Sequence, residues 1–501
     1  MILFRDAMLI DGSGAPPARG SLLVRDGRIE CLGANIEASQ CEVVECGGQA
    51  LSPGFIDIHS HSDLQVLRGD RAKTDQGVTA EVVGNCGFSA FPCGSRDADV
   101  RDFADPILFG SGEPWRWEGA REYLQDVRQR AQLCQVESLV GHGTLRNAVA
   151  GPRQGALEAA EADRMEGLLR ESLEDGAAGF STGLMYAPGS SAPREELARL
   201  CRVAARADKV YATHMRSYGD DLLPAIDEQL DLALASGCRL QISHLQAAGR
   251  RNWDKQRTAL DKIEQAHRDG IDVAFDIYPY LAGSTVLQQL LPQWALDGGV
   301  AQLLRRLSEP QTRARLLGEV AQSMPQQWSD IFIASVASPE RQAVVGRDVA
   351  SLAKEAGCDP AGYAFDLLAW ERAQVMMVSF NQSESNLREL LSHPLCSVIS
   401  DGVYVKGRPH PRLYGTFASL LGDISRERGW LSLSEAVHRI TARPAARFNI
   451  AGRGRLAPGF HADLVLFDPL TVAGPASYDA PTTPPTGIRM VLLNGRRIVP
   501  V

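Results

Sequence analysis

The chain has 501 residues, of which 44% are hydrophobic and 23% are charged, a balance typical of globular proteins that bury a large core. The net charge is -9, and the sequence has no cluster of basic residues. Electrostatic attraction to nucleic acid or to an anionic membrane is therefore not expected. We therefore expect a small-molecule substrate. The ten cysteines include no CxxC pair and predict neither a disulfide framework nor a structural zinc knuckle.

The first residues of the chain carry charges within their apolar run. Arg5 and Asp6 interrupt it, so the segment lacks the continuous apolar stretch that a signal peptide or a membrane span requires. We therefore expect a cytoplasmic protein with no membrane partner.

Both ends of the chain predict β structure. Short segments of alternating apolar and polar residues, separated by glycine-containing turns, extend from residue 1 to about residue 50 and return beyond residue 450. A small β domain is therefore predicted from residues 1–51 together with residues 450–501.

Between these ends, short apolar strands alternate with amphipathic helices, which is the pattern of a parallel sheet with crossover helices. The predicted strands lie in GFIDIHSH, VTAEVVGNC, VESLVGHG, AAGFSTGL, KVYATHMR, RLQISHLQ, VAFDIYPY and CSVISDG. Three of the helices end at Gly176, Gly237 and Gly270. Eight such units predict an α/β fold, a (β/α)8 TIM-like barrel over residues 52–449. The segment from about residue 287 to 378 is too long for a connection and predicts an inserted, partly helical subdomain over the barrel mouth.

Potential metal ligands recur where the predicted strands end. These residues are His59, His61, Cys86, His214, His244 and Asp401. Because the carboxyl ends of barrel strands meet at one mouth, the six side chains would converge there. His59 and His61 are two residues apart on a strand and point to the same side, which suits one ion. A single histidine or cysteine usually packs in a core, but recurrence at one end of successive strands favours a metal site.

Several motifs resemble the amidohydrolase superfamily, whose metal hydrolases combine a barrel with a β domain assembled from both termini. They are LSPGFIDIHSH, LAPGFHADLVLFDP, VLLNGRRIV and the late Ser-Asp-Gly. A further set resembles the D-aminoacylase (N-acyl-D-amino-acid deacylase) family: QGVTAEVVGNCGFSAFP, LVGHGTLR, GFSTGLMYAPG, YATHMRSYGD, ISHLQAAG, DIYPYLAGST and SDGVYVKGRPHPRLYGTF. This resemblance covers nearly the whole chain. It implies zinc-dependent hydrolysis of the amide bond of N-acyl-D-amino acids.

The resemblance divides the six ligands between a tightly held zinc site and a second, weaker one. The tight site matches Cys86, His214 and His244, and the weaker site matches His59, His61 and Asp401. Many amidohydrolases bridge two metals with a carboxylated lysine from the fourth strand, but AAGFSTGL contains no lysine. A cysteine thiolate is a soft, anionic ligand that suits zinc better than magnesium and could take its place. The expected cofactor is Zn2+, one ion tightly bound and a second held more weakly.

An amide hydrolase must activate water, polarise the carbonyl group and protonate the departing nitrogen. Asp401, at the end of the last strand, is the expected general base and acid, although an aspartate before a glycine is also a common turn residue. His142, at the end of the third strand, is a candidate to stabilise the oxyanion or to orient the water. A buried, hydrogen-bonded structural histidine is the competing interpretation.

The α-carboxylate of a D-amino acid requires fixed donors, and an arginine guanidinium suits it best. Arg412 is the leading candidate, and the resemblance adds Tyr278, Ser284 and Tyr186 as substrate-binding positions. The chain departs from the family at Gln246, where D-aminoacylases commonly have lysine two residues past the second zinc histidine. Glutamine donates a hydrogen bond but carries no charge, so binding of the carboxylate would depend more on Arg412.

Two other functions stay open from the sequence. A related zinc hydrolase would act on a cyclic imide, a ureide or a dipeptide-like amide with the same metal and base. A catalytically inactive barrel would serve binding or assembly, although all six ligands are retained in this chain. A substrate panel and an elemental analysis for zinc distinguish these alternatives.

Overall fold

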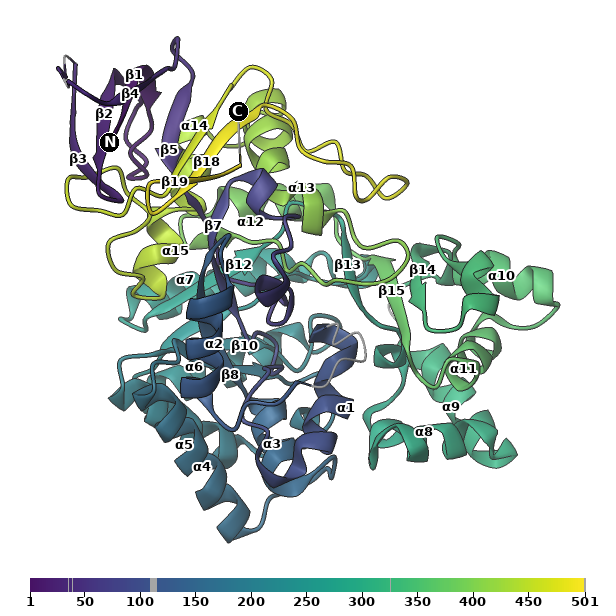
Figure 1. Ribbon diagram of the computed structural model, residues 1–501. Helices are drawn as coiled ribbons and strands as arrows, with labels where there is room; N and C mark the ends of the chain where they lie inside the picture. Colours follow the sequence, from purple (N-terminus) through teal and green to yellow (C-terminus); the bar gives the residue numbers. More distant parts are fainter. Residues whose placement is uncertain (35, 38, 109–114, 325, 500–501) are drawn as a thin grey trace.

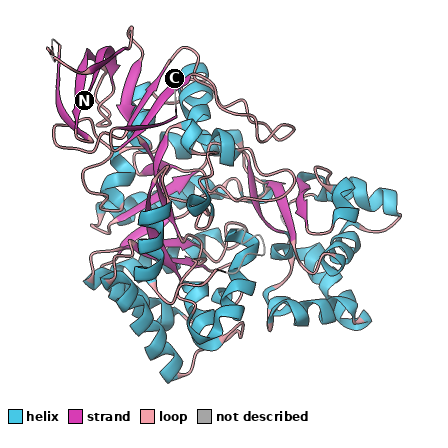
Figure 2. Ribbon diagram, in the orientation of Figure 1, coloured by secondary structure: helices cyan, strands magenta, loops and turns pink. Residues whose placement is uncertain are grey.

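The computed structural model describes residues 1–34, 36, 37, 39–108, 115–324 and 326–499. Three sheets organise them (Figures 1 and 2). A parallel sheet lies at the centre of the molecule. A sheet made from the two ends of the chain lies at the upper left of Figure 1, and a three-stranded sheet lies at the right.

The central sheet is an eight-stranded parallel barrel. Its strands follow in chain order: β6 (Phe55–Asp57), β7 (Val78–Val83), β8 (Gln135–Gly141), β9 (Gly179–Gly183), β10 (Val210–His214), β11 (Arg239–Ile242), β12 (Val273–Ile277) and β16 (Cys396–Val398). A parallel bridge between Ser60 and Gly402 brings the first and last strands together. Beside it, the Asp401 amide donates to the His59 carbonyl oxygen at 2.9 Å. The predicted (β/α)8 barrel is confirmed strand for strand.

Helices cover the outside of the barrel (Figure 1). They include α2 (Ala120–Arg130), α4 (Ala159–Glu174), α5 (Arg194–Arg206), α6 (Leu222–Ser236), α7 (Lys255–Arg268) and α12 (Glu384–Ser392). With helices outside and side chains inside, a barrel strand is buried on both faces, as all six residues of β7 are. The predicted ends of α4, α6 and α7 are confirmed by Gly176, Gly237 and Gly270, whose φ angles are 109°, 72° and 93°. Among the described residues, no helix is long and apolar enough to cross a membrane.

The second sheet joins the two ends of the chain, whose purple and yellow strands lie side by side in Figure 1. Its strands are β1 (Ile2–Leu9), β2 (Ala18–Arg25), β3 (Arg28–Gly33), β4 (Glu42–Glu45), β5 (Ala50–Pro53), β17 (Leu464–Phe467), β18 (Ile488–Leu493) and β19 (Arg496–Val499). β5 and β17 pair in antiparallel register from Pro53 opposite Leu464 to Ala50 opposite Phe467. A separate apolar cluster that includes Phe4, Leu464 and Leu492 fills one face. The proposed domain boundaries stay a prediction.

The third sheet lies between β12 and β16 in the chain. Its strands are β13 (Ala282–Val286), β14 (Ile331–Val336) and β15 (Val375–Phe380), and the segment also contains helices α8 (Gly299–Ser308), α9 (Pro310–Ser323), α10 (Val349–Ala356) and α11 (Pro360–Trp370). β15 lies in the middle and pairs antiparallel with both neighbours. The helices have an apolar core of their own, to which Leu303, Leu316 and Phe365 belong. The sequence predicted helical structure in this region but not these strands.

Candidate active site

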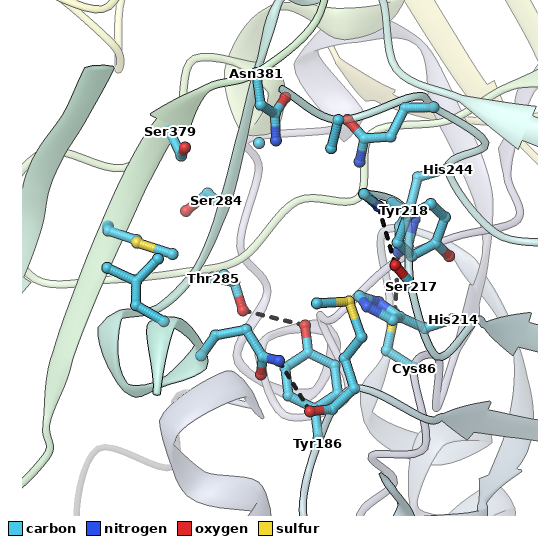
Figure 3. Close-up of a pocket in the computed structure, with 18 of the residues that line it drawn as sticks. Cys86, Tyr186, His214, Ser217, Tyr218, His244, Ser284, Thr285, Ser379 and Asn381 are labelled. Carbon is cyan, nitrogen blue, oxygen red and sulfur yellow. Dashed lines mark hydrogen bonds between the residues drawn. The ribbon is translucent and has the colours of Figure 1, made fainter. Parts of the chain in front are cut away.

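The predicted metal ligands converge at the carboxyl ends of the barrel strands. One group contains His59, His61, Cys86 and Asp401, and the other contains Cys86, His214 and His244. Within each group, one ligand atom from every residue lies within 4.8 Å of the others, and all six side chains are buried. Cys86 belongs to both groups, so its sulfur is positioned between two potential metal positions. Figure 3 shows Cys86, His214 and His244 together on one side of the pocket.

The ligand atoms face one another at short distances. Cys86 Sγ lies 3.2 Å from His59 Nε2 and 3.6 Å from His244 Nε2. Asp401 Oδ1 lies 3.2 Å from His61 Nε2 and 3.4 Å from His59 Nε2. Imidazole nitrogen, thiolate sulfur and carboxylate oxygen are the three donor types that zinc accepts in proteins.

The backbone is in the left-handed region at three of these ligands. Cys86, His244 and Asp401 have φ angles of 54°, 36° and 47°, and each closely follows the end of its strand, β7, β11 or β16. Residues other than glycine seldom adopt positive φ, and such positions cluster at functional sites, where the surrounding structure imposes them. The strand conformation therefore ends at or before each ligand. The ligand side chain no longer follows the in-and-out alternation of the strand residues.

The buried histidines lack the hydrogen bonds that imidazoles normally make. Within the described part of the chain, both ring nitrogens of His214 and the Nδ1 atoms of His61 and His244 have no partner. Burial lowers the pKa of His214 to about 3 and that of His61 to about 4, so these rings are neutral at pH 7 and keep lone pairs for a cation. Since an unpaired buried nitrogen is unfavourable, the residues present fit a metal ion.

The charges around the ligands also favour a cation. Burial raises the pKa of the Cys86 thiol, and a bound cation would hold it as the thiolate. Burial opposes protonation of His59, but the negative charges of Cys86 and Asp401 raise its pKa well above the usual range. Burial likewise opposes ionisation of Asp401, yet the charges of Arg412 and His59 hold its pKa well below the usual range. Asp401 is therefore a carboxylate at neutral pH.

Arg412 begins helix α13 (Arg412–Ser419) and is 1% exposed. Its Nη1 lies 2.9 Å from Asp401 Oδ2, and its Nη2 donates to the Ser284 carbonyl oxygen at 3.3 Å. The guanidinium lies over the Tyr278 ring, 4.5 Å from the centroid. Its Nε makes no hydrogen bond within the described residues and can serve a ligand. The sequence predicted Arg412 as a substrate-binding residue but not its ion pair with Asp401.

A cavity of about 440 Å³ brings together all the predicted site residues except His59 and His142. Those that line it are His61, Cys86, Tyr186, His214, His244, Gln246, Tyr278, Ser284, Asp401 and Arg412. Burial raises the pKa of Tyr278 to about 12, so its phenol keeps a proton to donate. The Tyr186 hydroxyl lies 3.1 Å from Thr285 Oγ1, a hydrogen bond drawn in Figure 3. Gln246 is buried, and its Oε1 has no partner among the described residues.

The structure does not place His142 at this cavity. Its Nε2 lies 2.6 Å from Glu196 Oε1, and Arg146 Nη1 lies 3.0 Å from the same oxygen. All three side chains are buried, and none is among the described residues that line the cavity. The pairing with Glu196 favours the competing interpretation of a hydrogen-bonded structural histidine, and the catalytic role of His142 stays a prediction.

Asp276, in β12, is a functional residue that the sequence did not predict. Its Oδ1 accepts the His244 amide N–H at 2.7 Å and lies 3.4 Å from His59 Nδ1. A carboxylate behind a metal-binding histidine fixes the orientation of the ring and the tautomer. The available signal was a lone aspartate inside the apolar segment VAFDIYPY, because a buried carboxylate requires partners.

A second buried network lies behind the ligands of the first and last strands. Lys73 is 2% exposed, and its Nζ lies 2.6 Å from Glu81 Oε2 and 3.1 Å from Asp57 Oδ2. Asp57 Oδ1 in turn accepts the amides of His59 at 3.3 Å and Ser400 at 3.1 Å. Lys73 therefore connects to the backbone at both His59 and the residue before Asp401.

A parallel (β/α)8 barrel with buried histidine, cysteine and carboxylate ligands at its mouth is an arrangement typical of metal-dependent enzymes, hydrolases among them. The profile of the amidohydrolase family matches residues 42–499. The chain belongs to this family.

Three known proteins are similar over almost the full length. An N-acyl-D-aspartate deacylase of Alcaligenes xylosoxydans xylosoxydans is 36% identical, over 98% of this chain and 90% of that protein. A D-aminoacylase of the same organism is 35% identical, over 99% and 93%. The crystal structure of N-acyl-D-glutamate deacylase from Bordetella bronchiseptica, complexed with zinc and a phosphonate that mimics the tetrahedral intermediate, has a TM-score of 0.85 and 35% identity, over 100% and 96%. The predicted resemblance to D-aminoacylases is confirmed.

Proposed function

We propose that this chain is a zinc-dependent hydrolase that removes the acyl group from N-acyl-D-amino acids, giving a D-amino acid and a carboxylate. The observation that carries the proposal is the position of Arg412. A cation suited to a carboxylate lies 2.9 Å from Asp401, in the cavity that also contains the metal ligands. In an N-acyl amino acid, the carboxylate and the amide nitrogen are attached to the same carbon. The carboxylate could therefore contact Arg412 while the amide lies next to Asp401. The activities named for the relatives support the same substrate class.

The six ligands would hold one zinc ion tightly and a second more weakly. Cys86, His214 and His244 form the tight site, and His59, His61 and Asp401 form the weaker site together with the shared Cys86. When bound, zinc acts as a Lewis acid that polarises the amide carbonyl and lowers the pKa of water. Asp276 holds the His59 ring and the His244 backbone in position.

Asp401 moves the proton during hydrolysis. As a carboxylate it accepts a proton from the attacking water and delivers it to the amide nitrogen. A bond forms between the water oxygen and the carbonyl carbon, and the C–N bond breaks, so the proton leaves with the amine. Arg412 and His61 contact its two oxygens and hold the carboxylate beside the metal ligands.

Arg412, Tyr278 and Ser284 bind the α-carboxylate of the substrate. The guanidinium supplies the charge, and the Tyr278 and Ser284 hydroxyls are neutral donors that line the same cavity. Gln246 lines the same cavity and can donate a hydrogen bond, but it brings no charge. The Tyr186 ring lies against His214, with 4.8 Å between ring centroids, and forms the adjacent wall.

The experiment compares N-acetyl-D-amino acids with their carboxamides in the wild type and in Arg412→Ala. Loss of a charge-assisted pair is worth about 1.5–3 kcal/mol, so kcat/KM for the acids should fall roughly ten- to a hundredfold more than for the amides. Arg408→Ala is the matched control, because Arg408 lies outside the cavity and pairs with exposed Asp479. Equal losses of kcat/KM on the acids and on the carboxamides would show that Arg412 does not bind the substrate carboxylate. Turnover of cyclic amides without turnover of N-acetyl-D-amino acids would contradict the proposed function.

A further inference from the structure

We propose that His410 is a positioning residue, which fixes Arg412 against strand β13 so that the guanidinium can receive the substrate carboxylate. This rests on the proposed function, because it concerns how the residue assigned to the α-carboxylate is held. His410 lies two residues before Arg412 and is 3% exposed. It is not among the described residues that line the cavity, so it acts through Arg412 and not on the substrate.

Both ring nitrogens of His410 bind backbone groups. Nδ1 accepts the Arg412 amide N–H at 3.0 Å, and Nε2 lies 2.9 Å from the carbonyl oxygen of Ala282. A carbonyl oxygen can only accept, so Nε2 carries the proton and the ring is a neutral tautomer. Burial and the charge of Arg412 lower the pKa of His410 well below the usual range, which keeps the ring neutral at pH 7. One imidazole thus joins the first residue of α13 to the first residue of β13.

Strand β13 binds the side chain of Arg412 as well. β13 lies at the edge of the inserted sheet, next to β15. Alternate carbonyl groups of a strand point to the same edge, and two of them on β13 are used in this way. The Ala282 carbonyl binds the His410 ring, and the Ser284 carbonyl accepts Arg412 Nη2 at 3.3 Å. The start of α13 is therefore attached to β13 at two points, one on either side of the Arg412 backbone.

Two tyrosine rings hold the imidazole in this orientation. The Tyr280 ring meets it edge-on, with 5.2 Å between centroids and 89° between planes. The Tyr278 ring, on which the Arg412 guanidinium lies, has its centroid 6.2 Å from that of His410. A charge-assisted pair depends on distance and angle as well as on charge. Without the His410 bridge, Arg412 would keep its charge but lose its fixed position.

His410→Asn is designed to break one bond and keep the other. Asparagine Oδ1 can accept the amide two residues further on, as in an Asx turn, but the side chain is too short to reach Ala282. The ratio of kcat/KM for an N-acetyl-D-amino acid over its carboxamide should fall roughly three- to tenfold, mainly through a higher KM for the acid. The ratio isolates carboxylate binding from any effect on Asp401, which both substrates share.

His410→Gln is the complementary variant. Its longer side chain can reach the Ala282 carbonyl but no longer presents an acceptor to the Arg412 amide. It should lower the same ratio by a similar factor, because the bridge needs both bonds.

His393→Asn is the matched control. His393 is 8% exposed, its Nδ1 accepts the Leu395 amide two residues on at 3.2 Å, and its Nε2 lies 3.2 Å from Glu264 Oε1. It precedes β16, at the other end of that strand from Asp401, and is not among the described residues that line the cavity. This variant should leave the ratio unchanged.

A double-mutant cycle tests whether His410 acts through Arg412. In Arg412→Ala, the further change His410→Asn should not alter the ratio, because no guanidinium is left to position. A further fall would show that His410 acts independently of Arg412 and would overturn the proposal.

Zinc content and circular dichroism establish that the variants are folded. A folded, zinc-loaded His410→Asn with the wild-type ratio would also overturn the proposal, and His410→Gln decides by the same criterion if His410→Asn does not fold. Absence of turnover of N-acetyl-D-amino acids by the wild type would instead contradict the proposed function.

Discussion

Asp401 is contacted on both oxygens by groups with different tasks. Oδ1 faces the metal-ligand ring of His61 at 3.2 Å, and Oδ2 faces the guanidinium of Arg412 at 2.9 Å. One carboxylate thus connects the candidate metal ligands to Arg412, the residue proposed to bind the substrate carboxylate. Under the proposed function, this contact would bring the scissile amide next to Asp401 when a substrate carboxylate binds Arg412.

Asp401→Asn should lower kcat by about 10²–10⁴-fold, because the amide side chain cannot accept and return a proton. The tight zinc ion should stay bound, since Cys86, His214 and His244 are unchanged. Steady-state kinetics and elemental analysis on the same preparation measure both effects. Asp479→Asn, which alters an exposed aspartate, is the control. Near-normal kcat in Asp401→Asn would remove Asp401 from the proton path.

Residues whose chemistry depends on strand position could be predicted from the sequence, and residues that depend on distant partners could not. His59, Cys86 and His244 lie at strand ends, which apolar patterning locates. His142 also follows a strand, yet its partner Glu196 lies in a different helix, and nothing local to His142 indicates that pair. The Arg412–Asp401 contact likewise depends on how α13 returns to the mouth, which sequence spacing does not determine.

At the scale of elements, the Lys73 network joins three strand segments. Lys73 follows β6, Glu81 lies within β7, and Asp57 in β6 reaches the amide of Ser400 beyond β16. The Lys73 ammonium group is the cation that pairs with two buried carboxylates, Asp57 and Glu81. Asp57 in turn accepts the amides of His59 and of Ser400, the residue before Asp401.

Lys73→Met should destabilise the protein by about 3–5 kcal/mol, because Glu81 and Asp57 would stay buried without their cation. Urea denaturation followed by tryptophan fluorescence measures the change in midpoint. Lys262→Met is the control: its pair with Asp227 has side chains 34% and 51% exposed and should contribute about 1 kcal/mol or less. Similar midpoints for the two variants would show that the buried network does not stabilise the barrel.

The barrel strands could be predicted because they are buried on both faces, by helices outside and by side chains inside, and their sequences are largely apolar. The inserted sheet could not, because β13 and β14 both pair with β15, a strand that follows them only after several helices. Its side chains near the cavity, such as Met377, gain their position from that pairing.

For the whole molecule, the proposed tight zinc site would connect distant parts of the barrel. Cys86 follows β7, His214 ends β10 and His244 follows β11, so one ion joins strands that are not all neighbours. Zinc that binds only the folded state stabilises it by about 4 kcal/mol at a thousandfold excess over Kd.

Removal of zinc by a chelator should lower Tm, and added zinc should restore it. Cys86→Ala should melt near the chelated protein and respond weakly to zinc, whereas Cys358→Ala, which alters an exposed thiol, should respond as the wild type does. Differential scanning calorimetry with and without chelator measures these shifts. A full zinc response in Cys86→Ala would show that the sulfur is not a ligand.

The pairing of β5 with β17 has a consequence for biosynthesis. Pro53 and Leu464 lie opposite each other but are 411 residues apart (464 − 53). At about 5–20 residues per second, a ribosome needs roughly 20–80 s to deliver the second strand after the first. During that interval β5 presents an open edge, and the apolar face around Leu51 lacks its cover, a combination that favours aggregation. We therefore expect this edge of β5 to stay without its native partner until the last strands have emerged.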